Sequence, residues 1–358
     1  MAGNSLIAKP KGEKQSAGKF SCLNWEFWPW QAVYIPVFAY WVLLGIKNRN
    51  LKFPASVNPD MEVGGMFGNS KYRQLAKLPD QFKPRTLFFD ESSQTHDVLR
   101  ALENQSFEFP LIIKPDKVQR GKGVVKVNDS EELPDLIPHY KASFIIQEFV
   151  DLPFEAGVFF YRFPGEKKGR IPSLVVKEFL KVKGDGVQPI RELLRENPRG
   201  NMVLEDLEKR YGSWLDHIPE QGKEEIVEPI GNHNRGTAFL DGNHLINDQM
   251  RAIFDELADY LGEFYYGRFD IKASSPEDLT TGKNLKILEI NGANAEPAHI
   301  YHPGYSLWNA WKTLFKHWNI LDKIYRANLK RGHNPPSWRE LRYHKQEWDK
   351  AKKGATHT

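Results

Sequence analysis

The sequence predicts an α+β protein that is built around antiparallel β-sheets. Strand-like runs at residues 156–162 and 173–180 flank a Gly- and Lys-rich turn at 164–169, a pattern that is typical of a hairpin. Helical segments lie among the strands, and no repeat or low-complexity block is visible. A chain of 358 residues, of which 40% are hydrophobic, is long enough for two or three packed units.

The order of the elements follows from hydrophobic periodicity and turn residues. Up to residue 84, Pro, Gly and Asn punctuate the chain around one short helix at 70–78. The elements expected next are a strand at 86–89, a helix at 93–104, buried strands at 110–114 and 144–150, the hairpin described above, a helical region at 188–211, a long helix at 248–261 and a closing hairpin. Four regions result: an N-terminal region at 1–85, α+β units at 86–150 and 151–325, and a basic C-terminal tail at 326–358.

Charge and cysteine content restrict the classes of function. The formal net charge is +4, and outside the tail basic and acidic residues are interspersed, so no nucleic-acid footprint is indicated. The basic stretch at 330–353 predicts a solvated helix with a frayed end rather than a binding arm. Cys22 is the only cysteine, which excludes an intramolecular disulfide and a cysteine metal cluster and fits a reducing cytoplasm.

An uncharged, aromatic-rich segment at 27–46 marks the N-terminal region. Pro29 and Pro36 interrupt helical hydrogen bonding, and Trp and Tyr are scattered along the segment, so a membrane span is the least favoured interpretation. The long polar leader argues against a signal peptide. A buried structural segment and an interfacial, membrane-touching helix are about equally favoured. The second would place the protein peripherally at the inner face of a membrane.

A basic strand end and a glycine loop predict a phosphate site. Lys114 ends a buried strand, and Gly121 and Gly123 follow it. A lysine on a rigid strand can hold a phosphate, and a flexible glycine loop can close over the β- and γ-phosphates with its N–H groups. Lys177 is another cation that could face phosphates. Without further support, an ordinary surface hairpin explains the glycine loop better.

The strand at 144–150 ends in a segment that is suited to a purine. Gln147, Glu148 and Val150 stand where an interdomain connection is expected, so their backbone could offer N–H and C=O groups to an adenine edge. Glu155 lies close enough downstream to accept ribose hydroxyls. A core strand followed by a turn explains this segment equally well.

The closing hairpin carries candidate metal ligands. Asp270 and Glu289 fall near adjacent strand ends, and Asn291, two residues after Glu289, projects from the same strand face. Two carboxylates and an amide oxygen suit Mg²⁺. Arg268 points to the same face, where it could steady an oxyanion or a transferring phosphoryl group, or form a structural ion pair. Solvent-facing charges fit poorly, because apolar neighbours make this a buried strand.

Taken in order, these elements resemble the ATP-grasp superfamily over residues 86–318. The segment 267–270, Gly-Arg-Phe-Asp, is similar to the Gly-Arg-hydrophobic-Asp of D-alanine–D-alanine ligases, and the segment 182–186 with Ile190 is similar to one in cyanophycin synthetases. The resemblance implies an ATP-grasp fold, in which a nucleotide-lid subdomain at 86–150 and a larger subdomain with the metal site at 151–325 grip ATP. The aromatic-rich N-terminal region is atypical.

The resemblance also implies roles for the site residues. The implied ATP contacts are Lys114, Lys177, the Gly121/Gly123 loop and Lys71 for the phosphates, Gln147, Glu148 and Val150 for the adenine, and Glu155 for the ribose. Asp270, Glu289 and Asn291 would bind two Mg²⁺ (or Mn²⁺), with Glu289 bridging. Arg268 would stabilise a tetrahedral intermediate.

The implied activity is that of a carboxylate-amine ligase. ATP would phosphorylate a small-molecule carboxylate to an acyl phosphate, which an amine would attack to give an amide or peptide bond, ADP and phosphate. A kinase that phosphorylates a hydroxyl and a non-catalytic nucleotide-binding protein are the alternatives. The intact set of Lys114, Arg268, Asp270, Glu289 and Asn291 argues against the second, because a degenerate site is expected to lose at least one of them.

The sequence departs from the D-alanine ligases after Asn291. Where they have a short Gly- or Ser-bearing stretch that seats an amino-acid carboxylate, residues 292–302 add an acid and two histidines, so D-alanine is not the expected substrate. The region before residue 86 lacks the βαβ pattern of the usual preceding domain, so the acceptor pocket cannot be carried over. Candidates for substrate contacts are Glu296, His299, Tyr301 and His302.

Overall fold

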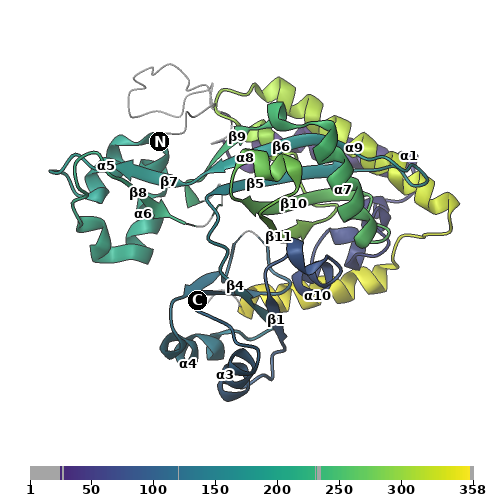
Figure 1. Cartoon of the computed structure of the whole chain (residues 1–358). Helices are drawn as coiled ribbons and strands as arrows, with labels where there is room; N and C mark the ends of the chain where they lie inside the picture. Colours follow the sequence, from purple (N-terminus) through teal and green to yellow (C-terminus); the bar gives the residue numbers. More distant parts are fainter. Residues whose placement is uncertain (1–24, 26–27, 120, 230, 232–234, 355–358) are drawn as a thin grey trace.

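The computed structural model describes residues 25, 28–119, 121–229, 231 and 235–354 (Figure 1). Cys22 and Phe27 lie outside the described residues, as do residues 355–358. All strand pairs in the described sheets are antiparallel, and helices accompany each sheet, so the predicted α+β class is confirmed.

The first unit is a four-stranded sheet with its own apolar core. Its strands are β1 (Thr86–Phe89), β2 (Leu111–Pro115), β3 (Val125–Val127) and β4 (Phe144–Glu148), in the order β1-β4-β2-β3. The helices α3 (Thr95–Asn104) and α4 (Leu133–Leu136) accompany it at the bottom of Figure 1. Val98 and Leu102, four residues apart on α3, pack with Ile113 and Phe144 of the sheet.

The second unit is a five-stranded sheet in the order β11-β10-β5-β6-β9. Its strands are β5 (Phe154–Tyr161), β6 (Arg170–Glu178), β9 (Ala238–Asp241), β10 (Tyr266–Ala273) and β11 (Leu285–Asn291). The helices α7 (Asp248–Tyr260) and α8 (Pro276–Thr281) lie over it in Figure 1. The expected closing hairpin is the pair β10 and β11.

Alternation along β5 gives this sheet two different faces. Val158 and Phe160 belong to the core that includes α7, whereas Phe159 and Tyr161 belong to the core that includes the long helix α9 (Leu307–Lys330). Glu155 shares the face of Phe159, because the two are an even number of residues apart. The α9 face is therefore apolar at one end and charged at the other, and the charged end forms the candidate site.

A third lobe extends from the large sheet at the left of Figure 1. It consists of β7 (Leu180–Lys183), β8 (Glu224–Glu228), α5 (Ile190–Glu196) and α6 (Pro198–Tyr211) around a separate core. The expected single helical region at 188–211 is interrupted, because the Asn197 side chain caps α6 by accepting from the N–H groups of Arg199 and Gly200. Pro198 takes the first helical position, where its missing N–H costs nothing.

The apolar segment of the N-terminal region forms α1 (Trp30–Lys47), with Pro36 inside the helix. One side of α1 lies against α9, and Val33, Val37 and Leu44 are buried. Tyr40 of α1 stacks near Phe315 of α9 at 4.9 Å between ring centroids. In the part of the chain that the structure describes, no helix is long and apolar enough to cross a membrane.

Short elements tie the rest of the N-terminal region to the large sheet. These are α2 (Lys71–Ala76), capped by Ser70, and 3₁₀ turns that include Phe53–Ser56 and Glu62–Gly65. Gly65 lies directly against the end of β11: a Cβ atom on it would be 2.6 Å from the Gly292 Cα. The Ala293 N–H donates to the Gly64 carbonyl at 3.0 Å. The candidate metal strand is thus held by the N-terminal region.

The basic tail contains a second long helix, α10 (Trp338–Gly354), most of whose side chains are exposed to solvent, with a few contacts to the rest of the fold. Trp348 faces Phe67 at 6.1 Å between ring centroids, and Lys350 pairs with Glu91 at 2.8 Å. Ala351 is buried against Val118. The helix therefore joins the N-terminal region to the first unit. Further 3₁₀ turns lie at Asp80–Phe82, Ser130–Glu132, Ile137–His139, Gly212–Asp216, Asn243–Leu245 and Ala298–Tyr301.

Candidate active site

A cavity of about 1070 Å³ lies between the two units, and most of the predicted site residues line it. The predicted residues that line it are Lys71, Lys114, Gly121, Gln147, Glu148, Val150, Glu155, Lys177, Arg268, Asp270, Glu289, Asn291, Glu296 and Tyr301. Gly123 lies between two lining residues, Lys122 and Val124. His299 and His302 are not among the lining residues.

The register of β10 and β11 brings the candidate metal ligands together. Asp270 is the cross-strand partner of Glu289, and Arg268 is the partner of Asn291. Directly opposed side chains lie on one face of a sheet. The Asn291 amide donates to Asp270 Oδ2 at 3.0 Å, which leaves the Asn291 amide oxygen as an acceptor.

A β-bulge interrupts this register beside the two acids. Asp270 pairs with Glu289 and Ile271 pairs with Ile287, so Leu288 has no partner on β10. The Leu288 carbonyl instead accepts a hydrogen bond from Lys114 Nζ at 3.3 Å. Bulges of this kind often re-aim groups next to active sites, and here the bulge joins β11 to Lys114.

Arg268 holds Asp270 through two hydrogen bonds. Its Nε donates to Asp270 Oδ1 at 2.9 Å and its Nη2 donates to Oδ2 at 3.1 Å. Burial on its own raises the pKa of Asp270, but Arg268 and then Lys177 outweigh it and leave that pKa lowered. Asp270 is therefore ionised at neutral pH, as a metal ligand must be.

Lys177 joins the acids of the sheet face. Its Nζ donates to Glu155 Oε1 at 2.7 Å and lies 3.8 Å from Asp270 Oδ1. Burial lowers the pKa of Lys177, but the Asp270 and Glu155 carboxylates outweigh this and leave the pKa raised. Lys177 thus keeps its charge in a buried position, where a phosphate could replace one of the carboxylates as its partner.

Lys114 is a buried lysine whose pKa is lowered. Its Nζ donates to Gln147 Oε1 at 2.9 Å, and its side chain reaches into the cavity from the end of β2. Burial lowers the pKa of Lys114 to about 8, an effect that Glu289 opposes and Lys71 reinforces. An anion bound beside it would favour the charged form, so Lys114 is poised to respond to a phosphate.

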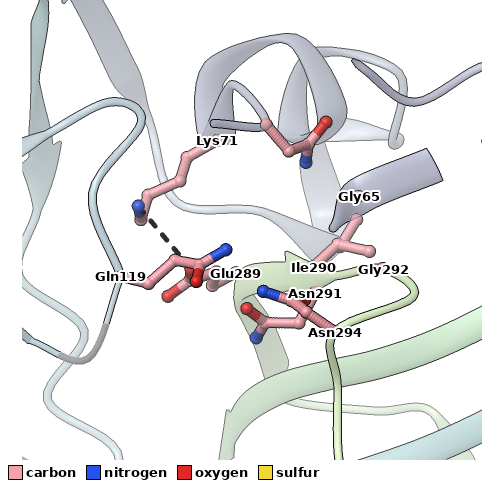
Figure 2. Close-up of a pocket in the computed structure, with 9 residues that line it drawn as sticks. Gly65, Lys71, Gln119, Glu289, Ile290, Asn291, Gly292 and Asn294 are labelled. Carbon is pink, nitrogen blue, oxygen red and sulfur yellow. Dashed lines mark ion pairs between the residues drawn. The ribbon is translucent and has the colours of Figure 1, made fainter. Parts of the chain in front are cut away.

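Lys71 connects Glu289 to the loop between β2 and β3. Its Nζ lies 3.6 Å from Glu289 Oε1, and it also donates to the Asp116 carbonyl at 3.2 Å and to the Val118 carbonyl. Figure 2 shows this ion pair beside Gln119, with Asn291 on the other side of Glu289. Lys71 can therefore act on both the metal strand and the phosphate loop.

The glycine loop takes a backbone conformation that requires glycine. Gly121 and Gly123 have φ values of +67° and +68°, a region that side chains with a Cβ rarely adopt. The Tyr140 hydroxyl donates to the Gly123 carbonyl at 2.7 Å and so anchors the far end of the loop. Residue 120, between the glycines and Gln119, lies outside the described residues.

Beside the candidate purine segment at 147–150 the cavity contains a lysine that was not among the predicted site residues. Lys272 lines the cavity, and its Nζ donates to the Val150 carbonyl at 3.1 Å and lies 5.4 Å from the Phe149 ring centroid. Burial lowers the pKa of Lys272. The signal was available, because Lys272 follows Asp270 by two residues and so faces the same way.

The four candidate substrate residues separate into two pairs. Glu296 and Tyr301 line the cavity, and the Tyr301 hydroxyl donates to Glu296 Oε2 at 3.0 Å. His299 is buried and lies 2.7 Å from the Ser173 hydroxyl, and burial lowers its pKa. His302 Nδ1 accepts from the Asp241 N–H at 3.1 Å. Both histidines thus have structural partners away from the cavity.

The residues present suit Mg²⁺ in the company of a phosphate chain. Among the described residues, no group of three or more His, Cys, Asp or Glu side chains gathers as a self-contained metal site. Asp270, Glu289 and Asn291 supply oxygen ligands, and phosphate oxygens and water would have to complete the shell. The described cavity lining holds six Lys or Arg and five Asp or Glu side chains, so a polyanion such as ATP would need cations with it.

No protein-family model matches the chain, and no curated protein matches it. Solved structures do resemble it. VanG D-Ala:D-Ser ligase from Enterococcus faecalis has 12% identity and a TM-score of 0.42, over 74% of this chain and 62% of its own. A bifunctional glutathione synthetase from Pasteurella multocida has 16% identity and a TM-score of 0.34, over 66% and 34%.

The D-cycloserine synthetase DcsG is also similar, with 12% identity and a TM-score of 0.39 over 73% of this chain and 70% of its own. The chain spans less than two thirds of the length of the first two structures. Each of the three is a ligase or a synthetase by name, and TM-scores below 0.5 at 12% to 16% identity carry no conclusion about the activity of this chain.

Proposed function

We propose that this protein is an ATP- and Mg²⁺-dependent carboxylate-amine ligase that works through an acyl phosphate. The observation that carries the proposal is the register of β10 and β11, which opposes Asp270 to Glu289 and Arg268 to Asn291 on the wall of a cavity. Lys71, Lys114 and Lys177 lie within ion-pair or hydrogen-bond distance of these strands. Cations, acids and one Arg in this arrangement suit the transfer of a phosphoryl group.

The chain would hold ATP between its two units. The segment at 147–150 would take the adenine, Glu155 the ribose, and Lys114 and Lys177 the phosphates, with the glycine loop closing over them. Phe149 lines the cavity and would form a wall of the adenine site. Lys126 Nζ lies 4.2 Å from its ring centroid, a cation–π distance. Asp270, Glu289 and Asn291 would hold two Mg²⁺, which supply charge neutralisation to the phosphate chain.

Arg268 would take a second role once Asp270 binds a metal ion. Both Asp270 oxygens are occupied by Arg268, so a cation at Asp270 would have to displace part of that pairing. The freed guanidinium donors would face the cavity, where they could stabilise the negative charge on the oxygen of a tetrahedral intermediate. The pairing therefore keeps Arg268 in place until ATP arrives.

The reaction balances without a redox partner. An oxygen of the substrate carboxylate attacks the γ-phosphorus of ATP, which forms the acyl phosphate and releases ADP. The amine nitrogen then attacks the acyl carbon, the phosphate leaves with the former carboxylate oxygen, and the nitrogen loses a proton. The products are an amide, ADP and phosphate.

The test is amine-dependent release of phosphate from ATP and Mg²⁺ across a panel of carboxylates and amines. Asp270→Asn is expected to lower kcat at least 100-fold, because a single ligand or transition-state group commonly contributes that much. Asp248→Asn is the control, since that side chain is 99% exposed and lies on α7. ADP without free phosphate would indicate a kinase, and ATP binding without turnover on any pair would refute the ligase.

We also propose that α1 contacts the inner face of a membrane. Its outward side exposes apolar residues at helical spacing, namely Ile35 (64%), Val42 (39%), Leu43 (62%) and Ile46 (66%). Arg49 follows and is exposed, which suits anionic headgroups, whereas Lys47 pairs with Asp322 at 3.2 Å.

Vesicle flotation tests this contact. The intact chain is expected to float with vesicles that contain phosphatidylserine, and a triple variant, Ile35→Ser/Leu43→Ser/Ile46→Ser, is expected to stay in the heavy fraction. Val187→Ser is the control, because Val187 is 74% exposed and belongs to the third lobe, away from α1. Equal behaviour of the intact chain and the triple variant would refute the contact.

A further inference from the structure

One end of the cavity is walled by aromatic and apolar side chains. We call this end the aromatic compartment and define it by Trp25, Trp28, Val33, Tyr34, Phe38, Phe239, Ala298 and Tyr301. The rings pack together, with 5.6 Å between the centroids of the tilted pair Trp25 and Tyr301 and 6.5 Å between those of the edge-on pair Phe239 and Tyr301. Five of these eight residues belong to the N-terminal region that is atypical of the resembled family, so the compartment is a property of this chain.

The compartment is fixed in place by hydrogen bonds to the rest of the fold. The Trp311 indole on α9 donates to the Val33 carbonyl at 2.8 Å and so holds α1 at this wall. The Tyr34 and Tyr301 hydroxyls lie 2.6 Å apart and join α1 to the segment after β11. The Trp25 indole donates to the Tyr305 carbonyl. The walls are therefore preformed and do not need a ligand to assemble them.

A carboxylate stands at the inner edge of the compartment. Glu296 lines the cavity and accepts from the Tyr301 hydroxyl at 3.0 Å. Burial, and then the Glu296 charge, raise the pKa of Tyr34, which keeps that hydroxyl protonated as a donor. Among the described residues that define the compartment, none is Lys, Arg or His, so Glu296 sets the sign of the charge that this end can accept.

Glu296 also lies next to the reacting groups. Its backbone carbonyl accepts from Arg268 Nη1 at 3.5 Å, and Arg268 in turn holds Asp270. A group bound to Glu296 is thus one side chain away from the metal acids. Lys71, Lys114 and Lys177 lie beside β10 and β11 instead, where a carboxylate that is about to be phosphorylated would bind.

We propose that the aromatic compartment binds the amine substrate, and that this amine is an apolar aryl- or alkyl-amine without a carboxylate of its own. The inference rests on the proposed ligase function and names the substrate class of the same site. Glu296 would pair with the ammonium group, and the aromatic rings would hold the apolar body and add cation–π attraction. An amino acid would bring its carboxylate to an end where the neighbouring cation, Arg268, already pairs with Asp270, and an unpaired carboxylate is costly in a desolvated site.

Calorimetric titration of the full chain with the non-hydrolysable ATP analogue AMP-PCP and Mg²⁺ tests the proposal without turnover. The probes are 2-phenylethylamine, phenylalanine and 3-phenylpropionate, which share a ring and differ in charge. We expect 2-phenylethylamine to bind at least tenfold more tightly than the other two. Glu296→Gln should weaken it at least tenfold, whereas Glu178→Gln, an exposed acid on β6, should leave it unchanged.

A second variant keeps the test decisive if Glu296→Gln does not fold. Trp28→Leu should weaken the binding of 2-phenylethylamine more than the binding of ethylamine, because only 2-phenylethylamine fills the compartment. Equal binding of the amine and the amino acid, or tighter binding of 3-phenylpropionate, would overturn the assignment. Amine binding in a protein that releases no phosphate on any substrate pair would instead refute the ligase and leave the amine site standing.

Discussion

The low pKa of Lys114 predicts that ATP affinity falls as the pH rises. If the charged form alone holds a phosphate, the pKa of about 8 means that most of the population is protonated at pH 7 and little of it at pH 9. The apparent Kd for ATP should then rise about tenfold between these pH values, which corresponds to about 1.4 kcal/mol. Titration calorimetry of ATP with Mg²⁺ at half-unit pH steps measures the curve.

Lys114→Arg and Lys114→Met separate this effect from other titrations. Arginine stays charged over the whole range, so Lys114→Arg should remove the dependence, whatever its effect on absolute affinity. Lys114→Met should bind ATP weakly at every pH. If the wild type and both variants show the same pH slope, the buried lysine does not control ATP affinity and the reasoning is refuted.

Three more predictions concern the site and its support. Between pH 8 and 10.5 the folded chain has already released the Lys114 proton, while the unfolded chain still holds it. The free energy of unfolding should therefore rise with pH over this range, by at most about 3 kcal/mol. Urea titration of the wild type and of Lys114→Met measures the difference. Gly292→Ala would place a Cβ 2.7 Å from the Gly65 Cα and should lower the free energy of unfolding by about 1–3 kcal/mol. Gly165→Ala should lower it less, because its Cβ would meet open space and only the positive φ would be strained. Equal urea midpoints for the two variants would contradict this. Lys71→Met should raise KM for ATP at least tenfold, because it releases both Glu289 and the loop carbonyl of Val118. Lys77→Met, at the residue that follows α2 and whose Nζ donates to the Leu261 carbonyl, should leave that KM unchanged. Unchanged ATP kinetics in Lys71→Met would remove Lys71 from the site.

The sequence predicted much of the site because the strands that carry it obey a period of two. Arg268 and Asp270, like Glu289 and Asn291, are two residues apart on buried strands, so their shared face followed from alternation. The α+β class followed from the same patterns. The strand at 86–89 was predicted with its exact bounds, whereas the strand expected at 144–150 ends at Glu148.

Other features depend on contacts that no local pattern contains. The segment of α1 is apolar around most of its circumference, and only its contact with α9 decides that Val33 is buried while Ile35 is exposed. The bulge at Leu288 arises from the pairing of two strands. His299 contacts the Ser173 hydroxyl, which is distant in the sequence, and no local pattern distinguishes this contact from one to a substrate. Its placement away from the cavity could therefore not be predicted.

Oxygen transfer is the most direct test of the acyl phosphate. A carboxylate substrate labelled with ¹⁸O on both oxygens is incubated with the enzyme, ATP, Mg²⁺ and the amine, and the released phosphate is examined by mass spectrometry. The account predicts one ¹⁸O atom in each phosphate, because the former carboxylate oxygen leaves with it. Unlabelled phosphate would contradict the account, since the carboxylate would then never have attacked the γ-phosphorus.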